Sequence, residues 1–537
     1  MLAFKLIEMK KITTIIASLG LIILISGCTK DISLLPQSAG TVTTFYKSGK
    51  DITSGLSGMY GSFLQEMTGT GTGNGKYFYW GEARSDNFGV GATTNVSVTE
   101  MLNNALTTNN VAADWAGFYR TISTANLNIA NIPTVSQYDN SVTPTVINNA
   151  LAQCYAMRAE CYFYIVRTWG SGVVWKDSYL DPTVSAVRPQ VPAQQIIDSV
   201  IIPDLTKAYS LIQHGQAPTV WYINEGAICA ILADVYMWRA SAPVSSTVGG
   251  AVGGPIGGAV DYANAITWYK NLFNAKGPTG VAYAGTSGAN LETQANWKNL
   301  FTAPATSIEP IWSLNWDQTV NSCACIPVSI QSSGNPLRVD PAIYTNWPKA
   351  TTDTRVTKTF DPTVVGSAAG QYLLKYYNVP NQATLTAQNA LAYNVYLTMY
   401  RLGDVYLSYA EALAQTNDLP NALKYLNYIR VRAGLTAYTA IQLPTTAAME
   451  TAILQERQFE LFGEGKRWFD LVRTNTVKTV MDPIINSRLT ITDPTTHVVT
   501  YLNTTGFVNA PNLYYWPVSQ TAHNANGLLV QNAGYFF

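Results

Sequence analysis

The chain has 537 residues and a formal net charge of +0, and only 12% of its residues are charged. This length is enough to bury a large core, and the sparse, balanced charge excludes the basic face that a nucleic-acid partner would need. The 32 tyrosines and 13 tryptophans are many for so little charge. A surface poor in charge and rich in aromatic rings suits neutral, hydroxylated ligands.

Residues 1–27 have the pattern of a lipoprotein signal peptide. Lys10 and Lys11 precede an apolar run over 12–25, which is shorter than the ~20 apolar residues of a membrane-spanning helix. The run ends in Ile-Ser-Gly-Cys, which matches a bacterial lipobox. We therefore expect cleavage before Cys28 and acylation of its sulfur, because several acyl chains on one residue anchor a protein without a helix.

The start of the chain can be Met1 or Met9, and Met9 places the two lysines directly after it. Residues 28–45 follow as a lipidated tether. In the apolar helical patterns beyond, Cys154, Cys161 and Cys229 are predicted to be buried thiols. Another two cysteines, Cys323 and Cys325, lack zinc or thioredoxin spacing and form either a strained disulfide or two free thiols.

The region from 46 to 274 predicts a series of helices, because apolar residues recur in it at helical spacing. Arg158 and Glu160 fall among apolar residues and are expected to be satisfied structural charges. The Gly-, Ser- and Pro-rich stretch 241–260 is predicted to be a surface loop. The predicted helices cover 52–65, 115–135, 151–169, 191–212, 223–240 and 261–273.

Residues 77–87 read YFYWGEARSDN and carry the first candidate ligand residues. A sugar site needs an aromatic ring and planar groups that form paired hydrogen bonds. Trp80 supplies the ring, and Arg84, Asp86 and Asn87 supply the planar groups. The alternative is structural: Arg84 pairs with the neighbouring Glu82, and the tryptophan belongs to the core. Both interpretations stay open for Arg84, Asp86 and Asn87.

Region 275–391 is the least helical part of the chain and is rich in Thr, Asn, Gly, Pro and aromatic residues. Its many prolines predict loops and edge strands. We expect Trp316, Trp347 and Arg355 to contribute ligand contacts from this insert. A buried ring cannot be told from an exposed one by sequence, so each tryptophan can equally be core.

Residues 397–434 predict an antiparallel helix pair. Leu402-Gly403-x-x-Tyr406 fits the first helix of a tetratricopeptide unit, and Asn417 marks the turn. Similar pairs are predicted at 112–169 and 191–240. Their irregular spacing indicates a degenerate helical scaffold with insertions.

Acid–base chemistry is one interpretation of three carboxylates that are spaced four residues apart, Glu456, Glu460 and Glu464. A glycosidase needs two carboxylates set apart across a substrate, whereas Arg457 and Arg467 are interleaved here. We therefore favour an ion-pair network that holds the last helices together. The three histidines, His214, His497 and His523, show no catalytic pattern.

Two long motifs in order carry a family resemblance. RLGDVYLSYAEAL with NALKYLNYIRVRAGL, followed by ILQERQFELFGEGKRWFDLVR, resembles the signature of the SusD/RagB family of outer-membrane glycan-capture lipoproteins. The resemblance implies a mostly α, SusD-like fold with tetratricopeptide-like helix pairs and an irregular insert of loops and short strands. It divides the chain into 1–27, 28–45, 46–274, 275–391 and 392–537.

The same resemblance implies a function. We expect a surface-exposed, lipid-anchored outer-membrane protein that captures an oligosaccharide and passes it to a SusC-like TonB-dependent transporter, without covalent chemistry. We predict no cofactor, and the sequence leaves open whether Ca²⁺ assists. A peptide ligand is the alternative known in the family, and glycoside hydrolysis is disfavoured by the carboxylate argument.

Overall fold

The computed structural model divides the chain into two units, Met1–Lys47 and Ser48–Phe537. The described part of the first unit contains the short helix α2 (Val42–Phe45). The account below concerns the second unit. The signal peptide with Cys28, and the pair Cys323 and Cys325, lie outside the described residues. The structure describes residues 42–68, 75–91, 95–176, 187–250, 253–284, 290–321, 337–340, 342–343, 347, 352–361, 373–381, 384, 394–488, 490–492, 499–501 and 511–537.

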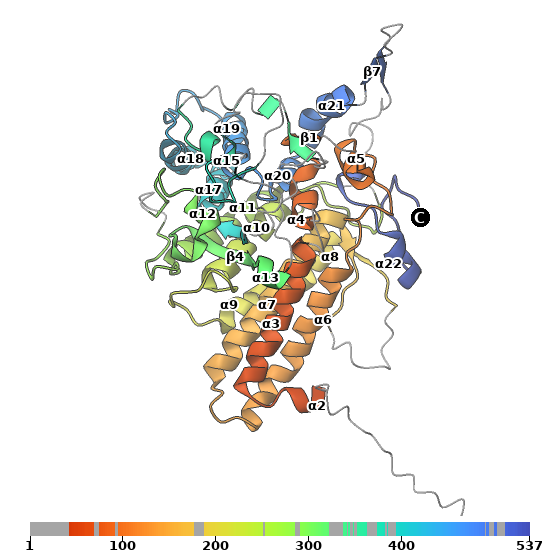
Figure 1. The fold of residues 1–537 in the computed structure, drawn as a ribbon, viewed down its shortest axis with the longest axis vertical. Coiled ribbons are helices and arrows are strands. Elements are labelled where there is room, and N and C mark those ends of the chain that lie inside the picture. The colour runs from red at the N-terminus through yellow and green to blue at the C-terminus, as the bar shows by residue number, and fades with distance from the viewer. Residues whose placement is uncertain are drawn as a thin grey trace, which may run out of the picture. The chain divides into compact units, whose positions relative to one another are not determined.

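Long helices form the scaffold, and helices that follow one another in the chain mostly pack side by side (Figure 1). Their series runs through α3 (Gly49–Thr68), α6 (Ala116–Asn131), α7 (Pro144–Trp169), α9 (Ile202–Leu211), α10 (Glu225–Ser241), α11 (Gly258–Asn274), α17 (Leu402–Gln415), α18 (Leu419–Arg432) and α19 (Thr446–Glu460). Each contacts the next, and α19 also packs on α17. The mostly α fold with paired helices is therefore confirmed.

The predicted helix ends are set by local chemistry. Gly170 ends α7 with φ +73°, in the left-handed region that favours glycine. Asn417 turns the chain after α17 with φ +67°, and Asp418 caps α18 by accepting from the Asn421 amide. Gly434 follows α18 with φ +85°, and a Cβ there would lie 2.6 Å from the Thr352 carbonyl oxygen.

The predicted helix at 191–212 is interrupted. The chain forms β3 (Val191–Pro192), α8 (Ala193–Ile196) and a π-helical turn (Ile197–Ile201) before α9. Pro203 lies in the first turn of α9 and has no N–H to donate to the preceding turn. The π-helical turn before Pro203 is wider than an α-helical turn, so the chain continues without the hydrogen bond that the proline cannot donate.

A strand replaces the start of the predicted helix pair at 397–434. Residues Val395–Arg401 form β6, which pairs antiparallel with β4 (Pro310–Trp316). The sequence of β6, VYLTMYR, is rich in β-branched and aromatic residues, which explains the strand. This sheet joins the predicted insert to the C-terminal helices.

Short elements complete the unit. The other two-stranded antiparallel sheets pair β1 (Phe88–Val90) with β5 (Leu337–Val339), β2 (Ser171–Gly172) with β3, and β7 (Thr490–Thr492) with β8 (Val499–Tyr501). In the described part of the chain, the remaining α-helices of four or more residues are α5 (Val96–Leu102), α12 (Asn299–Thr302), α13 (Gln318–Asn321), α15 (Val356–Thr359), α20 (Arg467–Arg473), α21 (Val477–Arg488) and α22 (Gln520–Ala525).

An aromatic core lies between the early helices. Phe118 of α6 stacks on Tyr164 of α7 with ring centroids 5.5 Å apart, and Trp80 packs against Phe118 at 5.1 Å. Cys154, Cys161 and Cys229 are fully buried free thiols, as predicted. Among the described residues, no helix combines the length and apolar character needed to cross a bilayer.

Candidate functional site

The first predicted ligand residues are structural. Trp80 is 0% exposed, and its indole Nε1 donates to the Ala112 carbonyl at 2.9 Å. Arg84 is also buried and donates to the carbonyls of Leu513 and Tyr514. Its guanidinium lies 4.1 Å over the Trp468 ring. The ligand role predicted for Trp80 and Arg84 is therefore wrong, because Trp80 packs among the early helices and Arg84 holds the C-terminal segment.

Asp86 and Asn87 are also bonded within the protein. Asp86 receives two bonds from Arg467, at 2.8 and 2.9 Å. Asn87 is fully buried and donates to Glu82 at 2.9 Å, and Gln458 donates to both residues. The predicted Glu82–Arg84 ion pair does not form. These bonds join the 82–87 segment to the last helices. The burial of Asn87 contradicts its predicted ligand role, whereas the Asp86 side chain is 14% exposed and its ligand role stays a prediction.

The three candidates from the insert are buried too. Trp316 is the inward-facing last residue of β4 and is 1% exposed. Trp347 is 1% exposed, stacks on Phe459 at 4.8 Å and donates to Asp353 at 2.9 Å. Arg355 is 1% exposed and pairs with Asp353 at 2.7 Å. None of the three is available to a ligand, so these predictions are corrected as well.

The three evenly spaced carboxylates belong to a buried ion-pair network. Glu456 and Glu460 both pair with Arg355, at 2.7 and 3.0 Å, and Glu464 pairs with Arg401 and Lys375, each at 2.8 Å. Burial favours the protonated form of Glu460, but three arginines outweigh it and hold its pKa well below the ordinary value. The expected network is present, although its arginines come mostly from outside the 453–473 segment.

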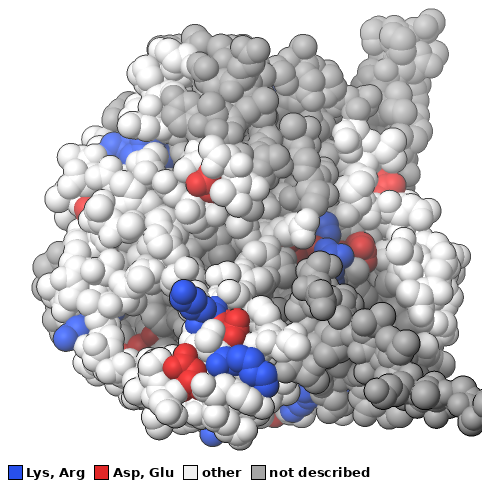
Figure 2. Space-filling view, turned by 60° about the horizontal axis from the view of Figure 1, so that its bottom comes forward, with Lys and Arg blue, Asp and Glu red and all other residues white. Residues whose placement is uncertain are grey.

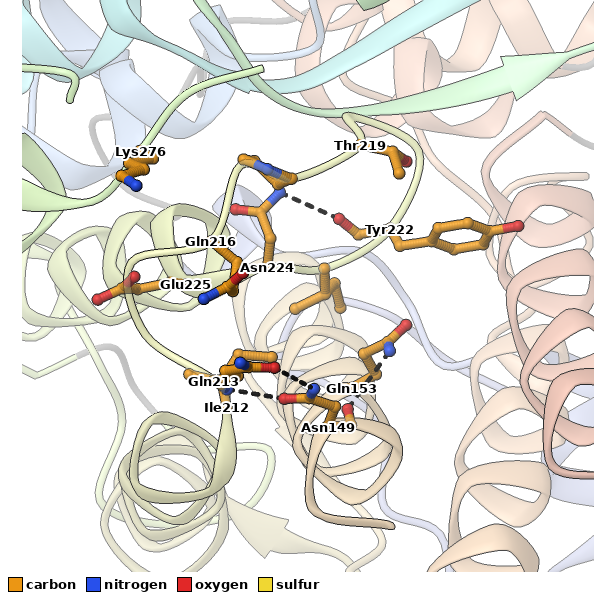
Figure 3. Close-up of a pocket in the computed structure, with 12 residues that line it drawn as sticks. Asn149, Gln153, Ile212, Gln213, Gln216, Thr219, Tyr222, Asn224, Glu225 and Lys276 are labelled. Atoms are coloured by element: carbon orange, nitrogen blue, oxygen red, sulfur yellow. Dashed lines mark hydrogen bonds between the residues drawn. The ribbon is translucent and has the colours of Figure 1, made fainter. Parts of the chain in front are cut away.

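A hollow of about 180 Å³ lies where the turn between α9 and α10 passes the start of α7 (Figure 3). Amides dominate its lining, with one carboxylate, one ammonium and one tyrosine. The lining residues are Asn149, Gln153, Ile212, Gln213, Gln216, Pro218, Thr219, Tyr222, Ile223, Asn224, Glu225 and Lys276. Uncharged hydrogen-bonding groups around a concave surface are the chemistry that a sugar hydroxyl requires.

Several hydrogen bonds fix the turn that lines the hollow. The Tyr60 hydroxyl accepts from the Ile223 amide at 2.8 Å and donates to Gln153 at 2.9 Å. Burial raises the pKa of Tyr60 well above its ordinary value, so the phenol keeps this donor proton. Asn149 accepts from the Gln213 amide at 2.7 Å, and Asn224 caps α10 and donates to the Ile311 carbonyl at 2.9 Å.

The amides of the hollow fall into two groups. Asn149, Gln153 and Asn224 are committed to holding the turn. In contrast, the described residues offer no acceptor to the Gln213 amide nitrogen and no donor to the Gln216 amide oxygen. Both side chains are exposed at the rim. Figure 3 shows Gln213 opposite Asn149, with Gln216 nearer the middle of the hollow. Their unused groups are available to a ligand.

Exposed rings and few charges surround this site. Tyr222 is 46% exposed, and its ring meets Tyr60 edge-on at 5.1 Å. The adjacent Trp221 is half-buried against Tyr396 of β6 at 5.3 Å. Figure 2 shows a face on which the described surface is mostly uncharged, with small groups of mixed sign. The surface chemistry therefore matches a neutral ligand better than an ionic one.

Comparison with known proteins points to one family. Residues 345–535 match the model of the SusD family. The chain is similar to SusD-like proteins. A SusD-like protein of Formosa agariphila is 26% identical over 498 residues, covering 88% of this chain and 92% of that protein.

Solved structures share the SusD-like fold. A SusD superfamily protein of Bacteroides thetaiotaomicron superposes with a TM-score of 0.65 at 22% identity, covering 91% of this chain and 99% of that one. A laminarin-binding SusD-like protein gives a TM-score of 0.66 at 19% identity, with 91% and 100% coverage. At these identities the likeness concerns the fold.

Sequence reasoning missed the amide-lined hollow of this SusD-like chain. The signal was present in IQHGQAPTVWYINE, residues 212–225, where Gln, Asn, Thr and Tyr lie between two helical patterns. A polar connection between helices is ordinary, however, so composition alone gave no reason to choose this one. The choice depends on Asn149 and Gln153, which come from α7.

Proposed function

We propose that this SusD-like protein captures an uncharged oligosaccharide at the cell surface and leaves it chemically unchanged. The observation that carries the proposal is the fixed hollow in which Gln213 and Gln216 present unused amide groups and whose lining includes the exposed Tyr222. Amides satisfy hydroxyls, and an exposed ring covers the C–H face of a sugar. The laminarin binding of a SusD-like protein with the same fold supports this ligand class.

The anchor and the partner complete the proposal. The lipobox that ends at Cys28 would fix the protein to the outer membrane, facing outward, and a SusC-like TonB-dependent transporter would receive the ligand. The anchor follows from the lipobox residues, and the transporter follows from the family resemblance. Capture requires no cofactor in this proposal, so a chelator such as EDTA leaves the affinity unchanged.

Glycan binding by the chain lacking residues 1–28 tests the proposal directly. The panel contains laminarihexaose, cellohexaose and xylohexaose, with binding measured by calorimetry and reducing ends measured after incubation. We expect binding to at least one uncharged oligosaccharide without new reducing ends. Released sugar would indicate hydrolysis, and binding of peptides alone would indicate the peptide-capture alternative; either result contradicts the proposal.

Two variants locate the binding in the hollow. Gln213→Ala and Gln216→Ala each remove one hydrogen bond to the ligand, worth about 0.5–1.5 kcal/mol, so the affinity falls about 2- to 10-fold. The melting temperature stays within about 1–2 °C, because exposed substitutions change stability little. Gln442→Ala, an exposed amide after α18, is the matched control and leaves binding unchanged.

A further inference from the structure

We propose that Glu225 makes the hollow specific for uncharged sugars and positions the turn that carries Gln213 and Gln216. This inference rests on the proposed function, because it assigns a role within that same site. It concerns two separable properties of one side chain: its hydrogen bonds, which orient the turn, and its negative charge, which disfavours anionic ligands.

The hydrogen bonds of Glu225 reach back from the first residue of α10 to the turn. One carboxylate oxygen, Oε1, lies 2.8 Å from His214 Nδ1, and the other accepts from the Gly215 amide at 2.8 Å. Gly215 has φ +69°, which favours glycine and makes the turn tight. These bonds hold the backbone between Gln213 and Gln216, so they set where the two free amides point.

The carboxylate of Glu225 is less exposed to solvent than the ammonium group of Lys276, the positive charge nearby. Its side chain is 14% exposed, whereas Lys276 is exposed and makes no ion pair with any described residue. Figure 3 places both on the same side of the hollow. Water and salt screen the exposed ammonium more strongly than the partly buried carboxylate, so the carboxylate dominates the field inside the hollow.

Among the described titratable residues at this carboxylate, Tyr209 and Cys229 can supply no positive charge, and His214 supplies one only when it is protonated. His214 is 48% exposed and contacts the carboxylate directly, and the N-terminus of α10 stabilises a negative charge at this position. A ligand carboxylate or sulfate would bring a second anion close to Glu225, and such like-charge contacts lower affinity. A hydroxyl can instead donate to the carboxylate.

Calorimetry on two variants separates charge from hydrogen bonding. The probes are the uncharged hexasaccharide bound most tightly in the panel above and hexagalacturonate. Glu225→Gln keeps an oxygen for the Gly215 amide and removes the charge, while Glu225→Ala removes both. We expect the wild type to prefer the uncharged probe by at least about tenfold, and Glu225→Gln to reduce this preference below about threefold while keeping its affinity for the uncharged probe.

The alanine variant tests the positioning role. Glu225→Ala should weaken binding of the uncharged probe about 5- to 10-fold, and Glu225→Gln should restore it, which a general loss of stability would not produce. If Glu225→Ala does not fold, Glu225→Gln still carries the charge test. Glu100 is the matched control, because its carboxylate holds Thr107 and Asn110 at 3.0 and 2.7 Å in another loop.

The outcomes separate a failure of this inference from a failure of the proposed function. A wild type that binds uncharged sugars but binds hexagalacturonate as tightly overturns the specificity and leaves the proposed function standing. Equal effects of Glu100→Gln and Glu225→Gln also overturn it, because they would indicate net charge rather than the site. A wild type that binds no glycan overturns the proposed function and the inference together.

Discussion

Arg401 and Glu460 form an ion pair whose Nη1–Oε1 distance is 2.6 Å, and both side chains are 0% exposed. The arginine ends β6 and the glutamate ends α19, so the pair ties the small sheet to the C-terminal helices. Arg432 and Arg355 reach the same glutamate at 2.5 and 3.0 Å. Because these charges are removed from water, each depends on the others for its solvation.

Replacing Arg401 with alanine is expected to destabilise the fold strongly. The substitution leaves Glu464 without its paired guanidinium and removes one of the partners of Glu460, and breaking a buried pair costs about 3–5 kcal/mol. Urea denaturation followed by circular dichroism measures the loss. Lys207→Ala removes the same charge from an exposed position of α9 and should change stability by less than about 0.5 kcal/mol. Equal losses in the two variants would contradict the role of the network.

Trp80 and Trp316, which the sequence suggested as ligand-binding rings, are expected to stabilise the fold instead. Trp80→Ala and Trp316→Ala each remove a ring that is at most 1% exposed, which costs about 3–5 kcal/mol. Differential scanning calorimetry should show a clear fall in melting temperature for both. Tyr222→Ala removes a ring that is 46% exposed, so it should lower glycan affinity and leave the melting temperature nearly unchanged. Unchanged melting of the Trp316 variant would place that ring at the surface instead.

Glu160 is expected to make stability fall as the pH rises. Burial raises its pKa from 4.5 to about 7, only partly offset by the Arg167 guanidinium at 3.9 Å, and neither carboxylate oxygen has a hydrogen-bond donor among the described residues. The folded chain therefore keeps a proton that the unfolded chain releases near pH 4.5. The stability from this proton is fully present below about pH 4.5 and is lost as the pH rises through about 7.

Glu160→Gln tests this dependence, because glutamine stays neutral at every pH. The variant should match the wild type near pH 4.5 and be more stable at pH 8, by on the order of 1–3 kcal/mol. Urea unfolding at pH 4.5, 6 and 8 measures the difference. Glu100→Gln, at a half-exposed position of α5, is the control variant. A Glu160 variant that loses stability at pH 8 would show that the carboxylate is charged and paired in the fold.

The anchor can be tested through Cys28. Cys28→Ser removes the thiol that acylation requires, so the protein should leave the membrane fraction and lose labelling by a palmitate analogue. Cys154→Ser is the control, since that thiol is fully buried and belongs to α7. Membrane retention of the serine variant at wild-type levels would refute lipid anchoring at this position.

Helix positions and caps could be predicted from the sequence because they depend on nearby residues. Asn417 adopts positive φ where the turn chemistry indicated, and the helices predicted to end at 169 and 434 end at Gly170 and Gly434, both with positive φ. The strand β6 could not be predicted with equal ease, because its hydrogen bonds are made to β4, about eighty residues earlier in the chain. The C-terminal signature also predicted the family, since a long pattern in the right order is specific.

The candidate site could not be predicted in the same way. Trp347 and Tyr222 are both aromatic residues in polar stretches, yet one is 1% exposed and stacks on Phe459, while the other is 46% exposed. Arg84, Asp86 and Arg355 look like ligand-binding groups, but each has a partner in the fold that lies far along the chain. Burial and long-range pairing depend on which segments meet, and local spacing does not encode that.

The sequence by itself predicted most of the helices, several of their ends and the family resemblance, because local propensity, turn chemistry and a long motif act within short stretches of chain. Only the tertiary structure decided that Trp80, Arg84, Trp316, Trp347 and Arg355 are buried, and that Gln213 and Gln216 keep unused amide groups at a hollow. Whether a polar side chain binds a ligand or stabilises the fold depends on whether another part of the chain already satisfies it.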